Sequence, residues 1–180
     1  MTALREFYNT QPGADLENWL ADENNLDMIY GMRILYIVGA RLDNESNSNE
    51  DTIYKFGVAH NDSIARLKSY IVDYGLKSET NPASGVKLYY LAGNKYNSSV
   101  EPSKSVVAST ERFLKKFLKA EKLIKKHRGS ERTFAKLRDI KSLIKNKNPE
   151  IYEEDIVTPK RSGLREVRTV PKKLTDDYYL

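Results

Sequence analysis

Three segments of the chain have the apolar pattern of β-strands. Residues 33–39 form a continuous run of β-branched and other apolar residues, which is typical of a central strand buried on both faces. Residues 52–58 predict a second strand, antiparallel to the first through an acidic, low-complexity loop at 43–52. Residues 86–92 predict a third strand, which follows a polar loop at 77–85.

Helical spacing of apolar residues is found between and after these strands. A short helix is expected over 15–21, and a second over 62–74, where Gly75 provides the residue that ends it. A longer, lysine-rich helix is expected over 105–126, because its apolar residues recur at intervals of three or four. Another basic helix is expected over 131–145, where Pro149 closes it.

The order of these elements predicts an α+β fold, in which a small three-stranded antiparallel sheet is flanked by helices. An N-terminal helical and acidic segment, residues 1–31, precedes the α+β domain, residues 32–147, which carries the basic helices. Residues 148–180 lack periodicity and contain several prolines, so we expect an extended C-terminal tail.

The composition excludes several kinds of chemistry and location. The absence of cysteine excludes disulfides, thiolate zinc sites and cysteine nucleophiles. Two histidines, His60 and His127, are too few for a multi-histidine metal site. No apolar run approaches the roughly 18 residues of a membrane span, and the N-terminus lacks the apolar core of a secretory signal. We therefore expect an intracellular protein without a membrane partner.

The net charge of +5 is unevenly distributed along the chain. Residues 1–62 carry 4 Lys or Arg against 11 Asp or Glu, whereas residues 112–147 carry 14 against 3. A basic block of this kind attracts polyanions, because each phosphate that it neutralises releases counterions. A solvated helix face, or packing against the acidic segment, is the alternative. On the first interpretation, the contacts to the DNA phosphate backbone come from Lys115, Lys119, Lys122, Lys125, Lys126, Arg128 and Arg132.

Four polar residues stand out because they lie among apolar neighbours: Tyr36, Lys55, Arg66 and Glu111. Alternation places Lys55 on the same side as Gly57, where the missing side chain leaves room for a ligand. The two cations suit the charge of a phosphodiester under attack, and the carboxylate suits Mg²⁺. A tyrosinate whose pKa is lowered by nearby positive charge suits proton removal from water. Taken singly, each residue also has a plainer structural explanation. Tyr36 is then a core tyrosine and Lys55 an edge-strand lysine. Arg66 is then an exposed arginine, and Glu111 a carboxylate paired with a neighbouring lysine.

Residues 32–134 resemble the GIY-YIG nuclease superfamily, in the branch found in some restriction enzymes, phages and large DNA viruses. The resemblance lies in the segments YIVGA, YKFGVAHNDSIARLKSY, STERFLKKFLKAEKL and RGSERTF. It places the family's first tyrosine at Tyr36, its YIG motif at 55–57 with lysine for tyrosine, its arginine at Arg66 and its glutamate at Glu111. The resemblance implies a DNA endonuclease dependent on Mg²⁺ or Mn²⁺, with one metal ion on Glu111 and a tyrosine as general base.

A catalytically silent structural or assembly protein with the same fold is the alternative, such as a minor capsid protein of a large DNA virus. Val58 stands where the family often has Ser, Arg or a catalytic His, which favours this alternative. The opposite charges of residues 1–62 and 112–147 suit packing between copies in a homo-oligomer, or packing against other capsid subunits. The C-terminal tail would dock on these neighbouring subunits. The protein would then be virion-associated. A third hypothesis is an accessory protein that binds DNA without cleaving it.

Overall fold

The structure is a computed structural model that describes residues 3–41, 52–72, 86–127 and 130–153. Several features that the sequence analysis names lie wholly or mostly outside the described residues: the loops at 43–52 and 77–85, the end of the helix expected over 62–74, Arg128, and the tail at 148–180.

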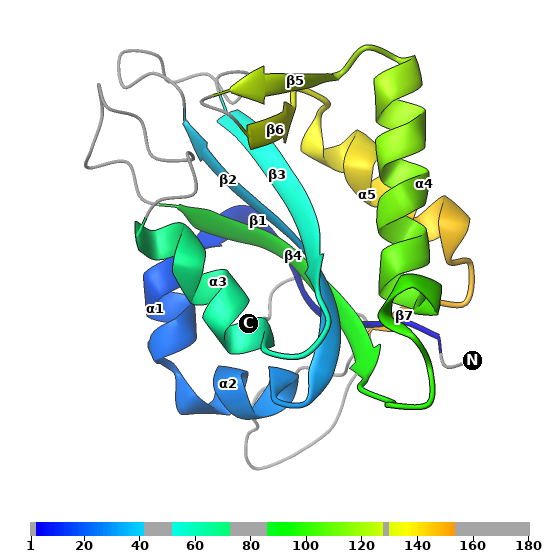
Figure 1. The fold of residues 1–180 in the computed structure, drawn as a ribbon. Coiled ribbons are helices and arrows are strands. Elements are labelled where there is room, and N and C mark those ends of the chain that lie inside the picture. The colour runs from blue at the N-terminus through cyan, green and yellow to red at the C-terminus, as the bar shows by residue number, and fades with distance from the viewer. Residues whose placement is uncertain (1–2, 42–51, 73–85, 128–129, 154–180) are drawn as a thin grey trace.

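A seven-stranded sheet forms the middle layer of the protein (Figure 1). Its strands follow the spatial order β5-β6-β3-β2-β4-β1-β7 and are antiparallel, except that β7 runs parallel to β1. The strands are β1 Arg5–Asp15, β2 Met32–Arg41, β3 Thr52–Ala59, β4 Lys87–Lys95, β5 Ile124–His127, β6 Ser130–Thr133 and β7 Tyr152–Glu153. The protein is α+β, but the prediction of a small three-stranded sheet is wrong.

The three strands expected from the sequence form the centre of this sheet, in the order β3-β2-β4. β2 and β3 are antiparallel neighbours, as predicted, and pair from Ile34↔Ala59 to Arg41↔Thr52. This register places Tyr36 directly opposite Gly57. The pairing therefore brings two of the sequence motifs together at one level of the sheet.

On one side the sheet is extended by β1, in a segment that the sequence analysis assigned to an N-terminal helical region. β1 pairs with β4, with an irregularity in the register between Asn9 and Ala14. Pro12 and Gly13 lie within this irregularity. Because the alternation of inward and outward residues is broken in mid-strand, β1 does not show a strand pattern in the sequence.

On the other side, the hairpin of β5 and β6 replaces parts of the two long helices expected over 105–126 and 131–145. The helix α4 ends at Ala120, and Lys122 adopts a positive φ of 60° that reverses the chain. The Leu123 amide then donates to the carbonyl of Leu118 over 2.9 Å. Spacing alone misses this ending, because apolar residues on either side of a tight turn can keep the interval of a helix.

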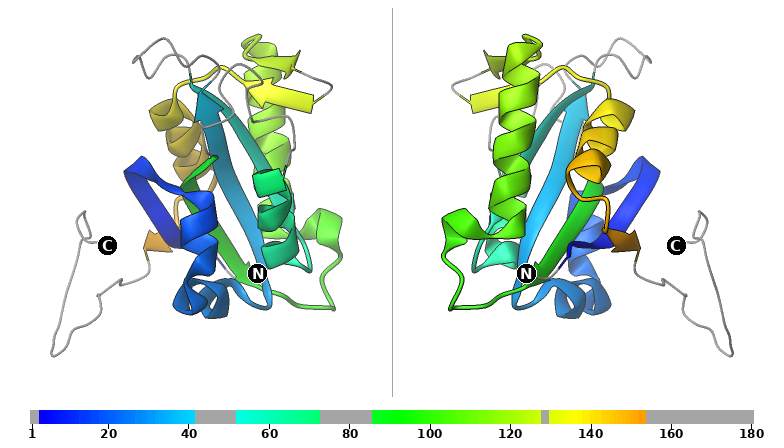
Figure 2. Two further views of the ribbon diagram at one scale, coloured as in Figure 1. Left: turned by 90° about the vertical axis from the view of Figure 1, so that its left-hand side faces the viewer. Right: turned by 90° about the vertical axis from the view of Figure 1, so that its right-hand side faces the viewer.

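Helices cover both faces of the sheet, as Figure 2 shows from two sides. One face carries α1 Leu16–Ala21, α2 Glu23–Ile29 and α3 Ser63–Val72. The other carries α4 Val106–Ala120, preceded by the 3₁₀ turn η2 Pro102–Lys104, and α5 Leu137–Lys147. Within the described residues, no helix combines the length and the apolar character that crossing a membrane requires.

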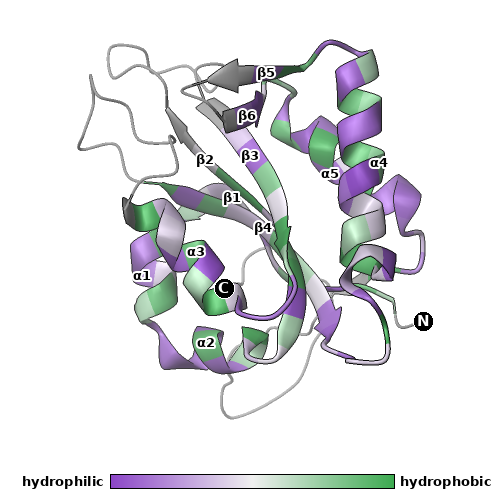
Figure 3. Cartoon of the chain, in the orientation of Figure 1, coloured by the Kyte–Doolittle hydropathy of each residue, from purple (hydrophilic) through white to green (hydrophobic). Residues whose placement is uncertain are grey.

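Two hydrophobic cores result, one on each face of the sheet. Leu35 and Ile37 of β2 pack with residues of α4 and α5, whereas Tyr36 and Val38 pack with residues of α1 and α3. Figure 3 shows hydrophobic and hydrophilic residues as bands along β3 and α4. Tyr36 therefore belongs to the core beneath α3, although it also reaches the pocket described next.

Candidate functional site

A pocket of about 140 Å³ lies at the outer edge of β3, between α3 and α4. Within the described strands, β6 pairs with β3 at a single position, Tyr54↔Thr133. The following stretch of β3 therefore lines the pocket instead of continuing a ladder. The lining residues are Tyr36, Lys55, Phe56, Gly57, Arg66, Glu111, Lys115, Ile124, Glu131, Arg132 and Thr133.

All four residues singled out from the sequence line this pocket. Tyr36 comes from β2, Lys55 from β3, Arg66 from α3 and Glu111 from α4. Arg66 is exposed, Lys55 and Glu111 are half-buried, and Tyr36 is 0% exposed. Four separate elements thus supply a phenol, two cations and a carboxylate to one site.

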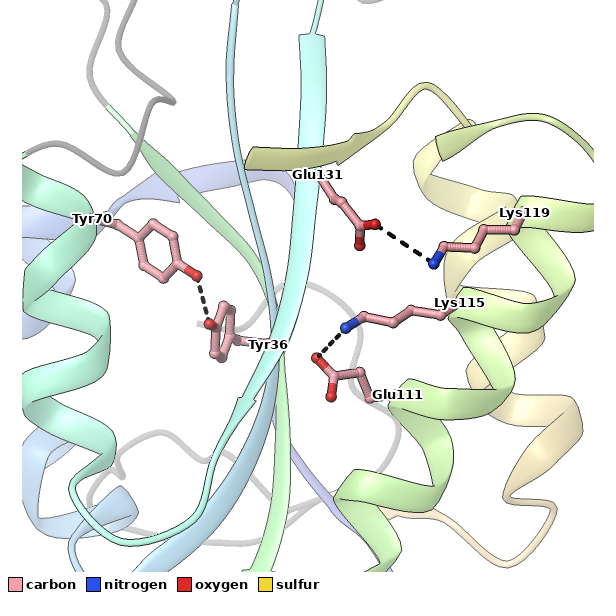
Figure 4. Close-up of polar contacts among 6 residues, drawn as sticks. All are labelled: Tyr36, Tyr70, Glu111, Lys115, Lys119 and Glu131. Atoms are coloured by element: carbon pink, nitrogen blue, oxygen red, sulfur yellow. Dashed lines mark hydrogen bonds and ion pairs between the residues drawn. The ribbon is translucent and has the colours of Figure 1, made fainter. Parts of the chain in front are cut away.

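The Tyr36 ring fills the space above Gly57. Its hydroxyl lies 2.6 Å from the hydroxyl of Tyr70, and the two rings meet edge to face at 5.5 Å (Figure 4). A Cβ atom at Gly57 would lie 2.5 Å from the Tyr36 hydroxyl. The missing side chain of Gly57 therefore makes room for Tyr36 and not, as the sequence analysis expected, for a ligand at the backbone.

Burial raises the pKa of Tyr36 above its ordinary value of 10.0. The hydrogen bond with Tyr70 and the positive charge and hydrogen bond of Arg66 lower this pKa, but they do not outweigh desolvation. The expected lowering of this pKa by neighbouring cations is therefore wrong for the protein alone. At neutral pH the phenol is protonated, so proton acceptance by Tyr36 is favoured by alkaline pH.

Tyr70 was not among the candidate site residues, although it lies one helical turn after Arg66. We expect the Tyr70→Phe substitution to raise the pKa of Tyr36 further, since it removes a hydrogen bond that lowers it. A hydrogen bond donated to the charged oxygen stabilises the deprotonated form, so its loss moves the titration of Tyr36 to higher pH. Titration followed by NMR of ¹³Cζ-labelled tyrosine measures the shift. A Tyr8→Phe variant, in which the changed residue lies on β1 and does not line the pocket, should leave the pKa of Tyr36 unchanged. A fall in the Tyr36 pKa in Tyr70→Phe would contradict the role given to the Tyr70 hydroxyl.

Two carboxylates line the pocket, and each is paired with a lysine of α4 (Figure 4). The Oε2 atom of Glu111 lies 3.8 Å from the Nζ atom of Lys115, and the side chain of Glu111 is 22% exposed. Glu131, on β6, lies 3.6 Å from Lys119. The ion pair between Glu111 and Lys115 is the one expected on a solvated face, yet here both partners line the pocket. Glu131 escaped the sequence analysis because it lies within the basic block.

The cations of the pocket act on one another. Burial lowers the pKa of Lys55, and the charges of Arg132, Lys115 and Arg66 lower it further, whereas Glu111 opposes the shift. Four basic side chains and two carboxylates therefore line a small space. A site that holds more positive than negative groups at close quarters favours an anionic ligand, which relieves their mutual repulsion.

The residues expected to contact nucleic acid occupy different positions from those predicted. Lys115 and Arg132 line the pocket, and Arg132 is buried in β6 and not exposed on a helix. Lys119 pairs with Glu131, and Lys122 lies exposed in the turn after α4. Lys125, on β5, lies over the ring of Phe134 at 5.5 Å. Lys126 also belongs to β5, and Arg128 lies outside the described residues.

The donor set fits a divalent metal ion only in a limited way. Among the described residues, no group of three or more Asp, Glu, His or Cys side chains lies close enough to form a metal site. The half-buried carboxylate of Glu111 is nevertheless a hard oxygen donor of the kind that Mg²⁺ accepts when water and substrate oxygens supply the other ligands. The site therefore fits a metal held through one protein carboxylate.

Comparisons of this chain with protein-family models, with curated proteins and with solved structures find no match.

Proposed function

We propose that this protein is a metal-dependent DNA endonuclease of the GIY-YIG type, which hydrolyses phosphodiester bonds in the pocket at the edge of β3. One observation carries the proposal. Tyr36, Lys55, Arg66 and Glu111 were selected as a phosphodiester site from the sequence, and all four line a single pocket although they come from four elements.

Each side chain has a role in the proposed reaction. A water molecule attacks the phosphorus atom, and the Tyr36 hydroxyl oxygen, in its deprotonated form, takes the water proton. The bond from phosphorus to the leaving sugar oxygen breaks, and that oxygen takes a proton from solvent water. Lys55, Arg66, Lys115 and Arg132 stabilise the additional negative charge that develops on the phosphate oxygens. The raised pKa of Tyr36 implies that cleavage increases with pH in the alkaline range.

Glu111 is the residue that we propose to hold the metal ion. A bound Mg²⁺ or Mn²⁺ supplies charge neutralisation at the phosphate oxygens. In the protein alone, the charge of Glu111 acts on Tyr36 and Lys55, which locates this carboxylate close to both groups.

Nicking of supercoiled plasmid in Mg²⁺ or Mn²⁺, compared with EDTA, tests the proposal. We expect metal-dependent nicking by the wild type and a loss of roughly 100- to 1,000-fold in Lys55→Met, because one preorganised cation is removed from the developing charge. Lys87→Met is the matched control, since Lys87 also lies on a strand but is exposed and does not line the pocket. Equal nicking by the wild type and Lys55→Met would contradict the proposal.

The raised pKa of Tyr36 also favours a second candidate, a protein that keeps the phosphate pocket but does not cleave. Such a protein would be a DNA-binding accessory or assembly protein. It would bind DNA with an affinity that falls steeply with salt, and it would show no nicking at any pH.

A further inference from the structure

A second pocket, of about 380 Å³, lies at the turns where α2 leads into β2 and β3 leads into α3. Two tyrosines line it, and both are unusually exposed for aromatic residues. Tyr30 is 79% exposed and Tyr96 is 45% exposed. The volume is within the range of small-molecule sites, about 300–1,000 Å³.

The walls of this pocket are fixed by hydrogen bonds between the segments that form it. The Tyr96 amide donates to the carbonyl of Gly31 over 2.9 Å, and the Ser63 hydroxyl donates to the carbonyl of Ile29 over 3.1 Å. The guanidinium of Arg33 lies 4.9 Å from the centre of the Tyr96 ring. Arg33 is itself held, because it donates to the carbonyls of Asn97 and Val100. The Tyr96 ring is therefore a preorganised surface.

The chemistry of this pocket differs from that of the pocket at the edge of β3, which we propose to hold a phosphate. Its described lining consists of two phenol rings, the amide of Asn61, the carboxylate of Asp62, and hydroxyl, aliphatic and backbone groups. A carboxylate in a lining without Lys or Arg disfavours a phosphate. Aromatic rings beside hydrogen-bonding groups favour a flat, polar-edged ring, since every nucleobase has a π-face and donors on its edge.

The two pockets are neighbours. Asp62 lines one and Arg66 lines the other, and the Arg66 amide donates to the carbonyl of Asp62. Arg66 therefore follows Asp62 by four positions of a helical turn, a rise of about 6 Å. Burial lowers the pKa of His60, which precedes Asn61; the charge of Arg33 lowers it further, and the charge of Glu111 in the other pocket opposes the shift. One nucleotide can bridge a separation of this size.

We propose that the Tyr30–Tyr96 pocket binds an unpaired nucleobase of a DNA strand whose phosphate occupies the pocket at the edge of β3. The inference rests on the proposed function, because the proposed reaction puts the phosphate in the pocket at the edge of β3. The protein then selects single-stranded or locally opened DNA, in which a base is free to leave the stack and lie against the tyrosines.

Isothermal titration calorimetry in metal-free, low-salt buffer tests this with two ligands, hexathymidylate and the same backbone with abasic sugars. We expect the wild type to bind the base-bearing strand roughly 5- to 100-fold more tightly, as stacking of one base on an aromatic residue provides. Tyr30→Ala and Tyr96→Ala should reduce or remove this preference while the abasic strand binds as before. Tyr30→Phe and Tyr96→Phe should retain it.

Phe117→Ala is the matched control, because Phe117 is 45% exposed, as is Tyr96. Phe117 lies about 200° around α4 from Lys115, which lines the pocket at the edge of β3, so it faces away from that pocket. Equal affinity of the wild type for the two strands would overturn the base pocket. If Lys55→Met still weakened both strands, the phosphate site would stand without it. Equal weakening of both strands by the alanine variants would also overturn the base pocket, and failure of the wild type to bind either strand would overturn both proposals.

Discussion

Replacing Glu111 with glutamine is expected to reduce metal-dependent nicking at least roughly 100-fold, with little change in the folded structure. Glutamine keeps the shape of the side chain but removes the negative charge that would hold a divalent metal ion. Glu111 is half-buried, lines the pocket, and acts electrostatically on Tyr36, Lys55 and His60. Nicking rates of wild type and Glu111→Gln over a series of Mg²⁺ concentrations measure the effect, and thermal unfolding checks the fold.

The chain offers a closely matched control for this experiment. Glu101 forms an ion pair with Lys104 at 3.8 Å, the same distance that separates Glu111 from Lys115. The side chain of Glu101 is 71% exposed, and it does not line the pocket. Glu101→Gln should therefore leave nicking unchanged. If Glu111→Gln retained wild-type activity, or if both variants lost it equally, the assignment of Glu111 as the metal-binding carboxylate would be wrong.

Replacing Gly57 with alanine is expected to destabilise the protein by about 2–3 kcal/mol, since it adds a methyl group to a filled core. The new Cβ would lie 2.5 Å from the hydroxyl and 2.8 Å from the Cζ atom of Tyr36. Tyr36 cannot easily move away, because it is fully buried and its hydroxyl is hydrogen-bonded to Tyr70. For a chain of this size, the melting temperature should fall on the order of 5–10 °C. Thermal unfolding by circular dichroism measures this change.

A double-mutant cycle with Tyr36→Phe identifies the cause of this destabilisation. Phenylalanine lacks the hydroxyl that makes the closest contact with the added Cβ, so Gly57→Ala should cost less in the Tyr36→Phe background than in the wild type. The same cost in both backgrounds would show that Tyr36 does not occupy the space above Gly57.

The sequence alone determined the local elements of the centre of the fold. The continuous apolar run of β2, the alternation in β3 and the stripe of α3 each depend on neighbouring residues, so they are visible without tertiary information. Asp15 also caps α1 locally, since its carboxylate accepts a hydrogen bond from the backbone amide of Asn18. In contrast, β5 and β6 are short and polar, and their strand conformation depends on pairing with each other and with β3.

The sequence also selected Tyr36, Lys55, Arg66 and Glu111, because polar residues among apolar neighbours are conspicuous in one dimension. The tertiary structure decided what each of them faces. Antiparallel pairing brings Tyr36 opposite Gly57, and the packing of α3 places Tyr70 against the Tyr36 hydroxyl. Burial then raises the pKa of Tyr36, a desolvation effect that depends on the whole surrounding core. Residue types and spacing thus determined the candidate chemistry, whereas the protonation of the phenol and the membership of Glu131 in the site depended on three-dimensional packing.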